Sequence, residues 1–448
     1  MIYKLEKPDL SKINRNKAIG LVLNREKQSI STLFNKSFSP IYLYWDKIKY
    51  KTLPKDISNE EFWYAIKFMR RAQYLPTVIK NENGDYFKWL RLPELEQFLH
   101  EADLNTGGAL FGFTKSIDEK TKYKFISRGI IEEAIASSQL EGANTTRRVA
   151  KQMLRERRKP RTDDEQMILN NYTAMQAIEE EYKNQKISLD LLFELHRLIA
   201  KDTIKEDEIG RFRKNSEDIV VADSDKSGRI YHIPPKAAFI KKEIQNFIQF
   251  ANDELETSFI HPIIKAIMIH FWIGYLHPFT DGNGRLARLF FYWYLLKNNY
   301  WAFAYLPISK IIKKSSIQYG NAYLYSEQDD LDLTYFIDYN IRKIKISIEN
   351  FREYFESKSK RNLKMNKLSK MKYNLNDRQI QLLQYYYEDK DARTSTPTHM
   401  NINRISRKTA IKDLKELEKF GFLISEREGK RVYYYTTDKV KGLFKKNA

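Results

Sequence analysis

The chain has 448 residues, of which 42% are hydrophobic and 14% aromatic, enough apolar material for two or three packed domains. It has no cysteine, which excludes disulfides, thiolate metal sites and a cysteine nucleophile. The apolar stretch 289–296 is far too short to cross a bilayer, and the first residues lack the apolar core of a signal peptide. We therefore expect a cytoplasmic protein without a membrane partner.

The net charge of +20 is distributed unevenly along the chain. Residues 358–448 carry 23 Lys and Arg against 10 Asp and Glu, which accounts for +13 of the total. A basic region of about ninety residues favours an acidic partner, of which nucleic acid is the commonest. A general bias towards lysine throughout the sequence is the alternative explanation.

The N-terminal region, 1–120, predicts a small mixed domain. Residues 40–45 alternate aromatic and aliphatic side chains and predict a strand, whereas 59–73 has the apolar spacing of an amphipathic helix. Asn83 and Gly84 lie between two apolar runs, where they predict the turn of a β-hairpin.

The central region, 121–357, predicts a helical domain with one hairpin. Apolar residues recur at helical spacing in 128–140, 162–183, 189–202, 236–255, 262–276, 284–298, 308–325 and 332–355. Residues 219–235 interrupt this pattern with two short apolar runs around a polar Ser-Gly turn, closed by Pro234 and Pro235. The fold class is therefore mainly α, with a β-hairpin inserted in the helical domain.

The C-terminal region predicts a basic linker, 358–371, followed by a winged-helix domain, 372–448. Helices are expected at 377–387, at 401–405 and from the N-cap Ser406 to Phe420, followed by strands at 422–425 and 432–435. Cations on the third helix and on the turn between the strands are candidate contacts to nucleic acid: Arg404, Arg407, Lys408, Lys412, Lys430 and Arg431. A winged helix that binds protein is the alternative.

The segment His277–Arg288, HPFTDGNGRLAR, concentrates residues that can handle phosphate. Pro278 ends one apolar helix, and a second helix begins near Gly284, where free N–H groups and the helix dipole favour an anion. Arg285 and Arg288 lie three residues apart on that helix and can face a polyphosphate. A tight turn with two surface arginines would leave the remaining polar residues without a role.

This segment resembles the signature of the Fic family, His-x-Phe-x-Asp/Glu-Gly-Asn-Gly-Arg-x-x-Arg, at every defining position. The resemblance extends over about half of the chain, from 123 to 355, and includes 210–213, 231–235 and 261–266. Ala287 replaces a small glycine found in many members. The resemblance implies a mainly helical core with a β-hairpin flap and transfer of AMP from ATP to a hydroxyl of a target protein.

The resemblance also implies a role for each residue of the site. His277 would be the catalytic base, and Asp281 would coordinate Mg²⁺ between the α- and β-phosphates. The phosphates would be held by Gly282, Asn283, Gly284, Arg285 and Arg288. Val220, Val221 and Tyr231 of the flap would dock the target by strand pairing. Tyr319 and Tyr323 would flank the adenine, although aromatic residues at this spacing also occur in helix cores.

Residues 137–142, SSQLEG, resemble the family's inhibitory motif, Ser/Thr-x-x-x-Glu-Gly/Asn, within an expected inhibitory helix near 128–142. The Glu141 carboxylate would hold Arg288 in a two-pronged salt bridge and leave ATP in an unproductive pose, with Ser137 as the first residue of the inhibitory motif. Glu141 would also be positioned to direct water for AMP removal, which makes a second, de-AMPylating activity an alternative.

Two other functions remain open at the level of sequence. One is transfer of a different group, such as UMP, phosphocholine or phosphate, by the same motif. The other is a DNA-binding transcriptional regulator whose Fic-like core only senses nucleotide. A homodimer is a further possible assembly.

Overall fold

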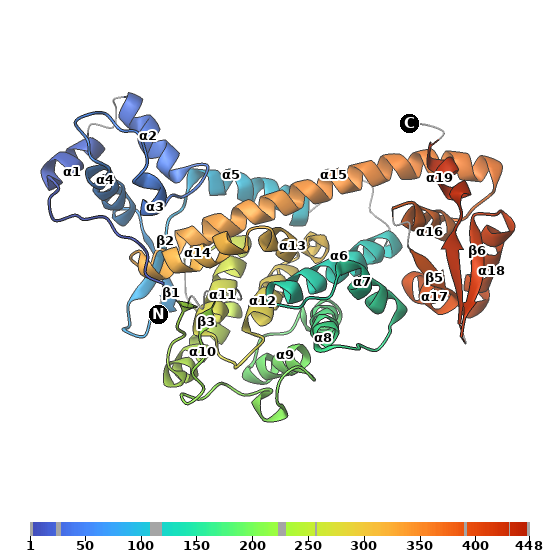
Figure 1. Ribbon diagram of the computed structural model, residues 1–448. Coiled ribbons are helices and arrows are strands. Elements are labelled where there is room, and N and C mark those ends of the chain that lie inside the picture. Colours follow the sequence, from blue (N-terminus) through green and yellow to red (C-terminus); the bar gives the residue numbers. More distant parts are fainter. Residues whose placement is uncertain are drawn as a thin grey trace. The chain divides into compact units, whose positions relative to one another are not determined.

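The computed structural model describes residues 3–23, 28–107, 119–222, 230–255, 258–388, 392–429 and 431–445. It is mainly α-helical, as predicted (Figure 1). The chain divides into two units, the first formed by 1–145 with 162–348 and the second by 146–161 with 349–448. Of the described helices, none combines the length and the apolar character needed to cross a membrane.

The first unit begins with small helices and a hairpin. Its elements are α1 (Arg15–Leu23), α2 (Gln28–Phe38), α3 (Trp45–Ile48), α4 (Asn59–Arg71), β1 (Leu75–Lys80), β2 (Tyr86–Trp89), α5 (Pro93–Ala102) and the π-helix η1 (Asp103–Gly107). Helix α4 begins with a capping box between Ser58 and Glu61, which satisfies two backbone N–H groups at its start. The predicted hairpin at Asn83 and Gly84 is confirmed, with β1 and β2 antiparallel.

The predicted strand 40–45 is wrong. The segment is irregular up to Tyr44, and Trp45 already begins α3. The backbone N–H groups of this segment do not pair with a neighbouring strand. Tyr42 N–H donates to the Asp338 side chain, and Leu43 N–H donates to Ser37 O. The alternating aromatic residues are buried, but burial alone does not make a strand without a strand partner.

The helical core of the first unit surrounds two buried helices, α11 and α12. Its elements are α6 (Glu119–Leu140), α8 (Asp163–Ala177), the π-helix η3 (Ile178–Tyr182), α9 (Leu189–Ala200), the 3₁₀ turn η4 (Glu206–Glu208), β3 (Val221–Ala222), β4 (Ile230–His232), α10 (Ala237–Ala251), α11 (Pro262–Leu276), α12 (Asn283–Lys297), the 3₁₀ turn η5 (Trp301–Tyr305), α13 (Ile308–Lys313) and α14 (Ser316–Gln328). Helices α11 and α12 lie side by side and are buried along almost their whole length (Figure 1). Apolar side chains occupy most positions of both helices, which requires cover on most sides.

The predicted helix 308–325 is divided into α13 and α14 at Ser315. The backbone of Ser315 leaves the helical region, and its hydroxyl lies 3.3 Å from Ile312 O. A serine hydroxyl that bonds the preceding turn competes with the helical backbone bonds, which explains the break.

The predicted linker 358–371 is also wrong, because these residues continue helix α15 (Thr334–Lys372). The segment is polar and basic, which suggested a linker, but it has no Gly or Pro and is rich in Lys, Arg, Leu and Met. These residues have high helix propensity, so nothing in the sequence ends the helix before Lys372.

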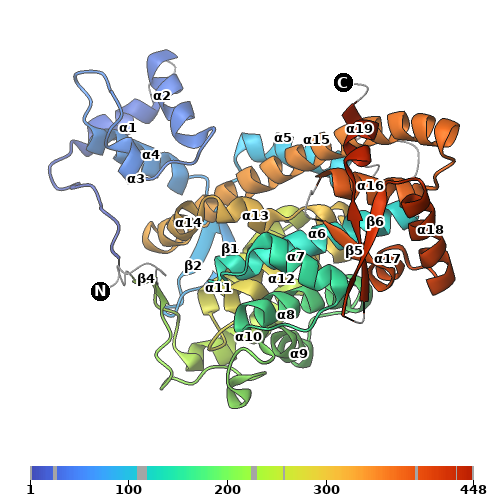
Figure 2. The ribbon, with the colours of Figure 1, turned by 45° about the vertical axis from the view of Figure 1, so that its right-hand side comes forward.

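The second unit combines helices with a three-stranded sheet in the order β5–β7–β6 (Figure 2). Its elements are α16 (Asp377–Glu388), β5 (Arg393–Ser395), α17 (Thr396–Asn403), α18 (Arg407–Lys419), β6 (Leu423–Glu428), β7 (Arg431–Thr436) and α19 (Asp438–Lys445). Ser406 caps α18 as predicted. The short helix predicted at 401–405 instead begins at Thr396, because Ser395 is its N-cap and a proline occupies its first turn.

Helix α7 (Arg147–Glu156) departs from the predicted domain boundaries. It follows α6 in the sequence, inside the predicted catalytic region 121–357, yet it belongs to the second unit. There Glu156 pairs with Arg393 at 3.1 Å, and the Arg155 guanidinium lies 4.0 Å from the Tyr385 ring centroid. The second unit is therefore built from two separate stretches of the chain, one of which begins five residues after Glu141.

Candidate functional site

The loop between α11 and α12 is shaped by two residues in the left-handed region. His277 ends α11 with φ 46°, and its N–H donates to Ile273 O at 2.9 Å. Gly282, with φ 84°, is the N-cap of α12. The first N–H bonded inside α12 is that of Leu286, which donates to Gly282 O. The N–H groups of the helical residues before Leu286 therefore make no bond inside the helix. Such N–H groups at the N-terminus of a helix favour an anion.

Phe279 and Asn283 hold this loop together. Phe279 is fully buried and stacks on the ring of His196, with the ring centroids 3.7 Å apart. The Asn283 side chain accepts from Phe279 N–H at 2.9 Å and donates to Phe279 O at 2.8 Å. The Asn283 side chain is therefore structural, and only its backbone N–H is left for the predicted contact to phosphate.

Two further residues, His196 and Arg213, fix the loop from outside the motif. His196 Nδ1 accepts from Gly210 N–H at 3.0 Å, so Nε2 carries the proton that is donated to Asp281 O. Burial lowers the pKa of His196 to about 4, which keeps this neutral form. Arg213 Nε donates to His277 O at 2.7 Å. Sequence reasoning gave His196 no role in the site, because a single histidine on an apolar helix carries no motif.

His277 has the tautomer and protonation state of a base. Its Nδ1 lies 3.2 Å from Gly274 O and therefore carries the proton, which leaves the Nε2 lone pair free. Burial and then the charge on His232 lower the pKa of His277 to about 4; Arg213 adds to this, while the Gly274 bond and the Glu141 charge oppose it. At neutral pH the imidazole is neutral, with one proton on Nδ1.

The two motif arginines have different environments. Arg285 is fully buried, donating from Nη2 to Asp281 at 2.8 Å and from Nη1 to Ile199 O at 3.1 Å. Arg288 is also buried; its Nε donates to the Ser137 hydroxyl at 2.8 Å and its Nη2 to Glu141 at 2.8 Å. The inhibitory segment 137–142 thus contacts Arg288 with two residues. The Glu141 carboxylate pairs with Nη2 only, because Nε is bonded to Ser137, so the two-pronged pairing predicted for Glu141 is not formed.

The Glu141 carboxylate also covers the start of α12. A side chain at Gly284 would place its Cβ 2.3 Å from Glu141 Oε1, so only glycine allows this approach. A carboxylate at a helix N-terminus is stabilised by the same dipole and N–H groups that favour a phosphate. Glu141 therefore occupies the position where an anionic ligand is expected.

One cavity of about 550 Å³ brings most of the predicted residues together. Its lining includes Glu141, Val221, Tyr231, His277, Gly284, Arg288, Tyr319 and Tyr323, and in addition His232. Asp281 and Gly282 of the adjacent loop and Asn283 and Arg285 of the first turn of α12 do not line it. Val220 lies outside the lining and is exposed, and the flap tip, 223–229, lies outside the described residues.

The two tyrosines predicted to flank adenine are engaged within the protein. The Tyr319 hydroxyl lies 2.8 Å from His270 Nε2. The Tyr323 ring stacks on Phe271 with centroids 5.3 Å apart. Both still line the cavity, so their predicted contact with adenine remains a prediction.

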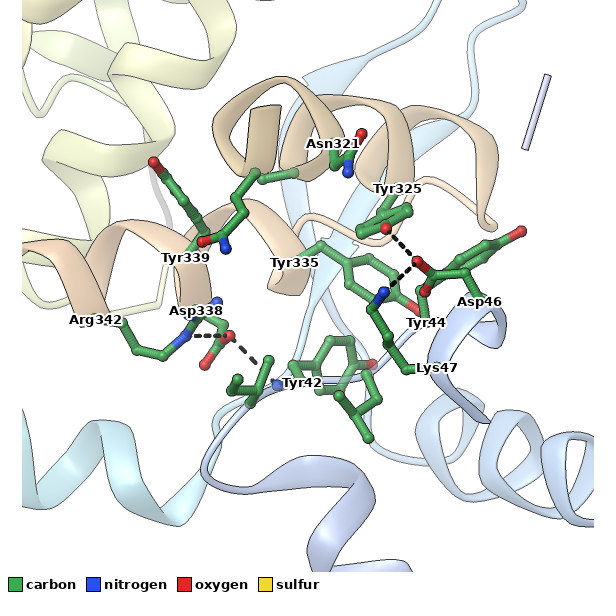
Figure 3. Close-up of a pocket in the computed structure, with 14 residues that line it drawn as sticks. Tyr42, Tyr44, Asp46, Lys47, Asn321, Tyr325, Tyr335, Asp338, Tyr339 and Arg342 are labelled. Atoms are coloured by element: carbon green, nitrogen blue, oxygen red, sulfur yellow. Dashed lines mark hydrogen bonds and ion pairs between the residues drawn. The ribbon is translucent and has the colours of Figure 1, made fainter. Parts of the chain in front are cut away.

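A second cavity, of about 330 Å³, lies on the other side of α14 (Figure 3). The 41–47 segment lines it together with α14 and α15, and it shares no lining residue with the first cavity. Its charged groups have partners: Arg342 donates to Asp338 at 3.0 Å, and the Tyr325 hydroxyl donates to Asp46 at 2.9 Å (Figure 3). We therefore assign these contacts to attaching the N-terminal segment to the helical core.

The candidate nucleic-acid residues are exposed where the structure describes them. Arg404 lies in the turn before α18, followed by Arg407, Lys408 and Lys412 on α18 itself. Arg431 begins β7, and Lys430 lies outside the described residues. The four cations from Arg404 to Lys412 thus come from one turn and the helix that follows it.

The described part of the chain has no group of three or more His, Asp or Glu side chains arranged to hold a metal by themselves. Asp281 is a single, partly exposed carboxylate that accepts from Arg285 and from Gly282 N–H. A lone carboxylate beside a phosphate site suits Mg²⁺, which keeps several waters and takes its other ligands from phosphates. The donor set therefore fits a magnesium ion that enters with a nucleotide.

Comparison with known proteins places this geometry in context. Residues 186–295 match the model of the Fic/DOC family. The chain is 36% identical over 110 residues to protein adenylyltransferase Fic of Nematostella vectensis, covering 24% of this chain and 22% of that protein. It is 32% identical over 107 residues to protein adenylyltransferase fic-1 of Caenorhabditis elegans, covering 24% and 19%. The chain thus spans about a fifth of the length of these relatives.

Among solved structures, the chain is similar to a Fic family protein from Desulfovibrio desulfuricans G20. The two superpose with a TM-score of 0.48 at 18% sequence identity, over 78% of this chain and 97% of that one.

Proposed function

Because residues 186–295 form a Fic domain, we propose that this chain is a protein adenylyltransferase that transfers AMP from ATP to a hydroxyl of a target protein. One observation carries the proposal: a single cavity contains a neutral histidine, the N-terminus of a helix and a buried arginine. These are a base, a site for an anion and a second phosphate partner. The reaction needs all three.

In the proposed reaction His277 Nε2 takes the proton of the target hydroxyl. The hydroxyl oxygen attacks the α-phosphorus of ATP, a new P–O ester bond forms, and the bond to the β-phosphate oxygen breaks, releasing pyrophosphate. The N–H groups that start α12 stabilise the charge on the α-phosphate. Asp281 is the residue placed to hold Mg²⁺, which would neutralise phosphate charge when bound. Positioning and charge stabilisation supply the catalysis.

The flap supports docking of the target by strand pairing. Strands β3 and β4 are antiparallel, with Val221 opposite His232. Tyr3 N–H donates to Ile230 O at 2.8 Å, so one backbone acceptor of β4 is already paired. We therefore assign target docking to the β3 edge, where Val220 is 43% exposed.

We propose that Glu141 inhibits the reaction in this conformation. Its carboxylate pairs with Arg288 and covers Gly284, so it competes with ATP for both phosphate-binding elements of the cavity. ATP bound beside it would lack the Arg288 contact and would place its α-phosphate away from His277. Removal of the Glu141 side chain is expected to release both elements.

The test uses the full chain, a cell lysate and ATP labelled at either the α- or the γ-phosphate. Glu141→Gly is expected to transfer the α-label and not the γ-label, and Glu141→Gly with His277→Ala is expected to transfer neither. Transfer of the γ-label would show phosphate transfer instead, and UMP or phosphocholine transfer would require a different donor. Removal of the α-label from the labelled target by the unmodified chain, which keeps Glu141, would identify the second, de-AMPylating activity. No α-label with Glu141→Gly would refute the proposal.

A second candidate function is binding of duplex DNA by the second unit as a winged helix. The observation that favours it is the set of exposed cations on α18, Arg407, Lys408 and Lys412. Helix α18 begins after its N-cap Ser406, and a short turn connects it to α17. A salt-dependent gel shift with the full chain tests it. Arg407→Ala with Lys408→Ala should weaken binding, whereas Lys241→Ala with Lys242→Ala on α10 removes equal charge and should not. Binding that is absent or insensitive to salt favours a protein partner.

A further inference from the structure

His232 has hydrogen bonds that a neutral histidine cannot make when Glu327 is an ionised carboxylate. Its Nδ1 lies 2.8 Å from Glu327 Oε2, and its Nε2 lies 2.8 Å from Tyr275 O. A carboxylate and a carbonyl only accept, so both ring nitrogens must donate. The geometry therefore requires the imidazolium form.

The environment of this pair supports the same charge state. The His232 and Glu327 side chains are only 7% and 18% exposed. Within the described residues, the second oxygen of Glu327, Oε1, is buried without a hydrogen-bond partner. A buried carboxylate is costly unless an opposite charge compensates it, and His232 is the cation that the structure places against Glu327.

The three partners come from three elements that form the site. His232 is the last residue of β4 in the flap, Glu327 is on α14, and Tyr275 is in the final turn of α11, two residues before His277. The His232 ring is thus the point at which the flap is attached to the end of the helix that carries the base. His232 also lines the same cavity as His277.

We propose that His232, held as an imidazolium by Glu327 and Tyr275 O, is a positioning residue that fixes the flap and keeps His277 in its base form. Its role in transfer rests on the proposed adenylyltransferase function, whereas its charge state does not. It makes no contact with the transferred group in this proposal and acts through His277 and through the flap.

The charges around both histidines agree with this assignment. Burial alone would lower the pKa of His232, but the charge and hydrogen bond of Glu327 and the bond to Tyr275 O outweigh it, and the pKa is raised; Arg213 opposes. For His277 burial is the largest cause of its lowered pKa and the His232 charge is the second. A fixed positive charge near a base favours its unprotonated form.

The pKa of His232 is raised and that of His277 is lowered, so the two histidines affect the protein at opposite ends of the pH range. The raised pKa of His232 means that its contribution to flap attachment is complete below its ordinary pKa and is lost as the pH rises through the raised value. The lowered pKa of His277 means that the base form persists down to about pH 4. Removal of the His232 charge should therefore raise the pKa of His277 and move the acidic limb of activity upwards.

The direct test is a histidine ring titration by ¹⁵N NMR on the full chain, which has only seven histidines. In the unmodified protein His232 should be doubly protonated at pH 7 and His277 singly protonated. His232→Gln should raise the pKa of His277, and Glu327→Gln should do so in the same direction. A neutral His232 ring at pH 7 in the unmodified protein would overturn the proposal without any variant.

His261→Gln is the matched control. His261 also faces a carboxylate, Asp103, at 3.1 Å, but its Nδ1 accepts from Ile263 N–H, so it is outside the His232 network. The His261→Gln variant should leave the pKa of His277 unchanged. An unchanged His277 pKa in His232→Gln would equally contradict the proposal.

Transfer activity gives a second readout in the Glu141→Gly background. Adding Glu327→Gln should shift the acidic limb of kcat upwards and raise KM for the target, while Glu327→Asp, which keeps the charge, should retain most activity. A uniform loss with an unshifted pH profile would indicate a merely structural role and contradict the proposal. If Glu141→Gly itself transfers nothing, the proposed function fails, while the NMR titration still decides the charge state of His232.

Discussion

Helix α6 positions Glu141 next to Arg288, and the position of this helix depends on Gly129. A Cβ added there would lie 2.3 Å from Ala304 O and 2.5 Å from Tyr305 Cα, both backbone atoms of η5. Restoring an ordinary contact distance requires α6 to move by about 1 Å. Gly129→Ala should therefore cost about 1–3 kcal/mol through overpacking, offset by about 1 kcal/mol of improved helix propensity.

The same displacement should weaken inhibition. The Glu141–Arg288 hydrogen bond is 2.8 Å long, and a 1 Å shift of a rigid helix would lengthen it beyond bonding distance. Hydrogen bonds to charged groups contribute about 1.5–3 kcal/mol, so the released form should become roughly ten- to a hundredfold more populated. The α-label transfer should rise by a similar factor.

The assay compares Gly129→Ala with Gly20→Ala, a helical glycine whose added Cβ would meet no atom within 4 Å. Urea unfolding followed by tryptophan fluorescence reports on the first unit, because all six tryptophans lie in it. Gly129→Ala should unfold at lower urea concentration and label more strongly, whereas Gly20→Ala should be as stable as the unmodified chain or more so. A Gly129→Ala protein with unchanged stability and labelling would refute the reasoning.

Three further predictions concern the site loop, the base and the second unit. Asn283→Ala removes both bonds to Phe279 and should abolish labelling in the Glu141→Gly background while circular dichroism stays unchanged; retained labelling would contradict a structural role for this side chain. Because the pKa of His277 is lowered to about 4, labelling by Glu141→Gly should stay near its pH 7 rate down to about pH 5, and half-loss near pH 6.5 would contradict the assigned pKa. Arg393→Ala removes the partner of Glu156 and should increase hydrogen exchange in 147–156, which an unchanged exchange pattern would disprove.

The sequence predicted best those features whose cause is local. The hairpin at Asn83 and Gly84, the N-cap Ser406 and the extent of α11 follow from turn chemistry, capping and apolar length, and all three are present. The motif loop also depends on local signals, since Pro278 and Gly282 end one helix and start the next.

Features that depend on distant partners could not be predicted in this way. The 40–45 segment has the composition of a strand, but no strand of the described part of the chain pairs with it. The sequence predicts that helix α7 belongs to the catalytic region, and only its contacts with Tyr385 and Arg393 assign it to the second unit. His196 is a single histidine without a motif, and the resemblance at 231–235 gives His232 no role. Their roles arise from acceptors 85 and 95 residues away in the sequence.

The most direct test of the central claim is the intact mass of the protein labelled by the Glu141→Gly chain in the presence of ATP and Mg²⁺. The account predicts an increase of one AMP on a Ser, Thr or Tyr side chain, absent when His277→Ala is added. An increase equal to a phosphate, or an AMP adduct that forms equally well without His277, would contradict it.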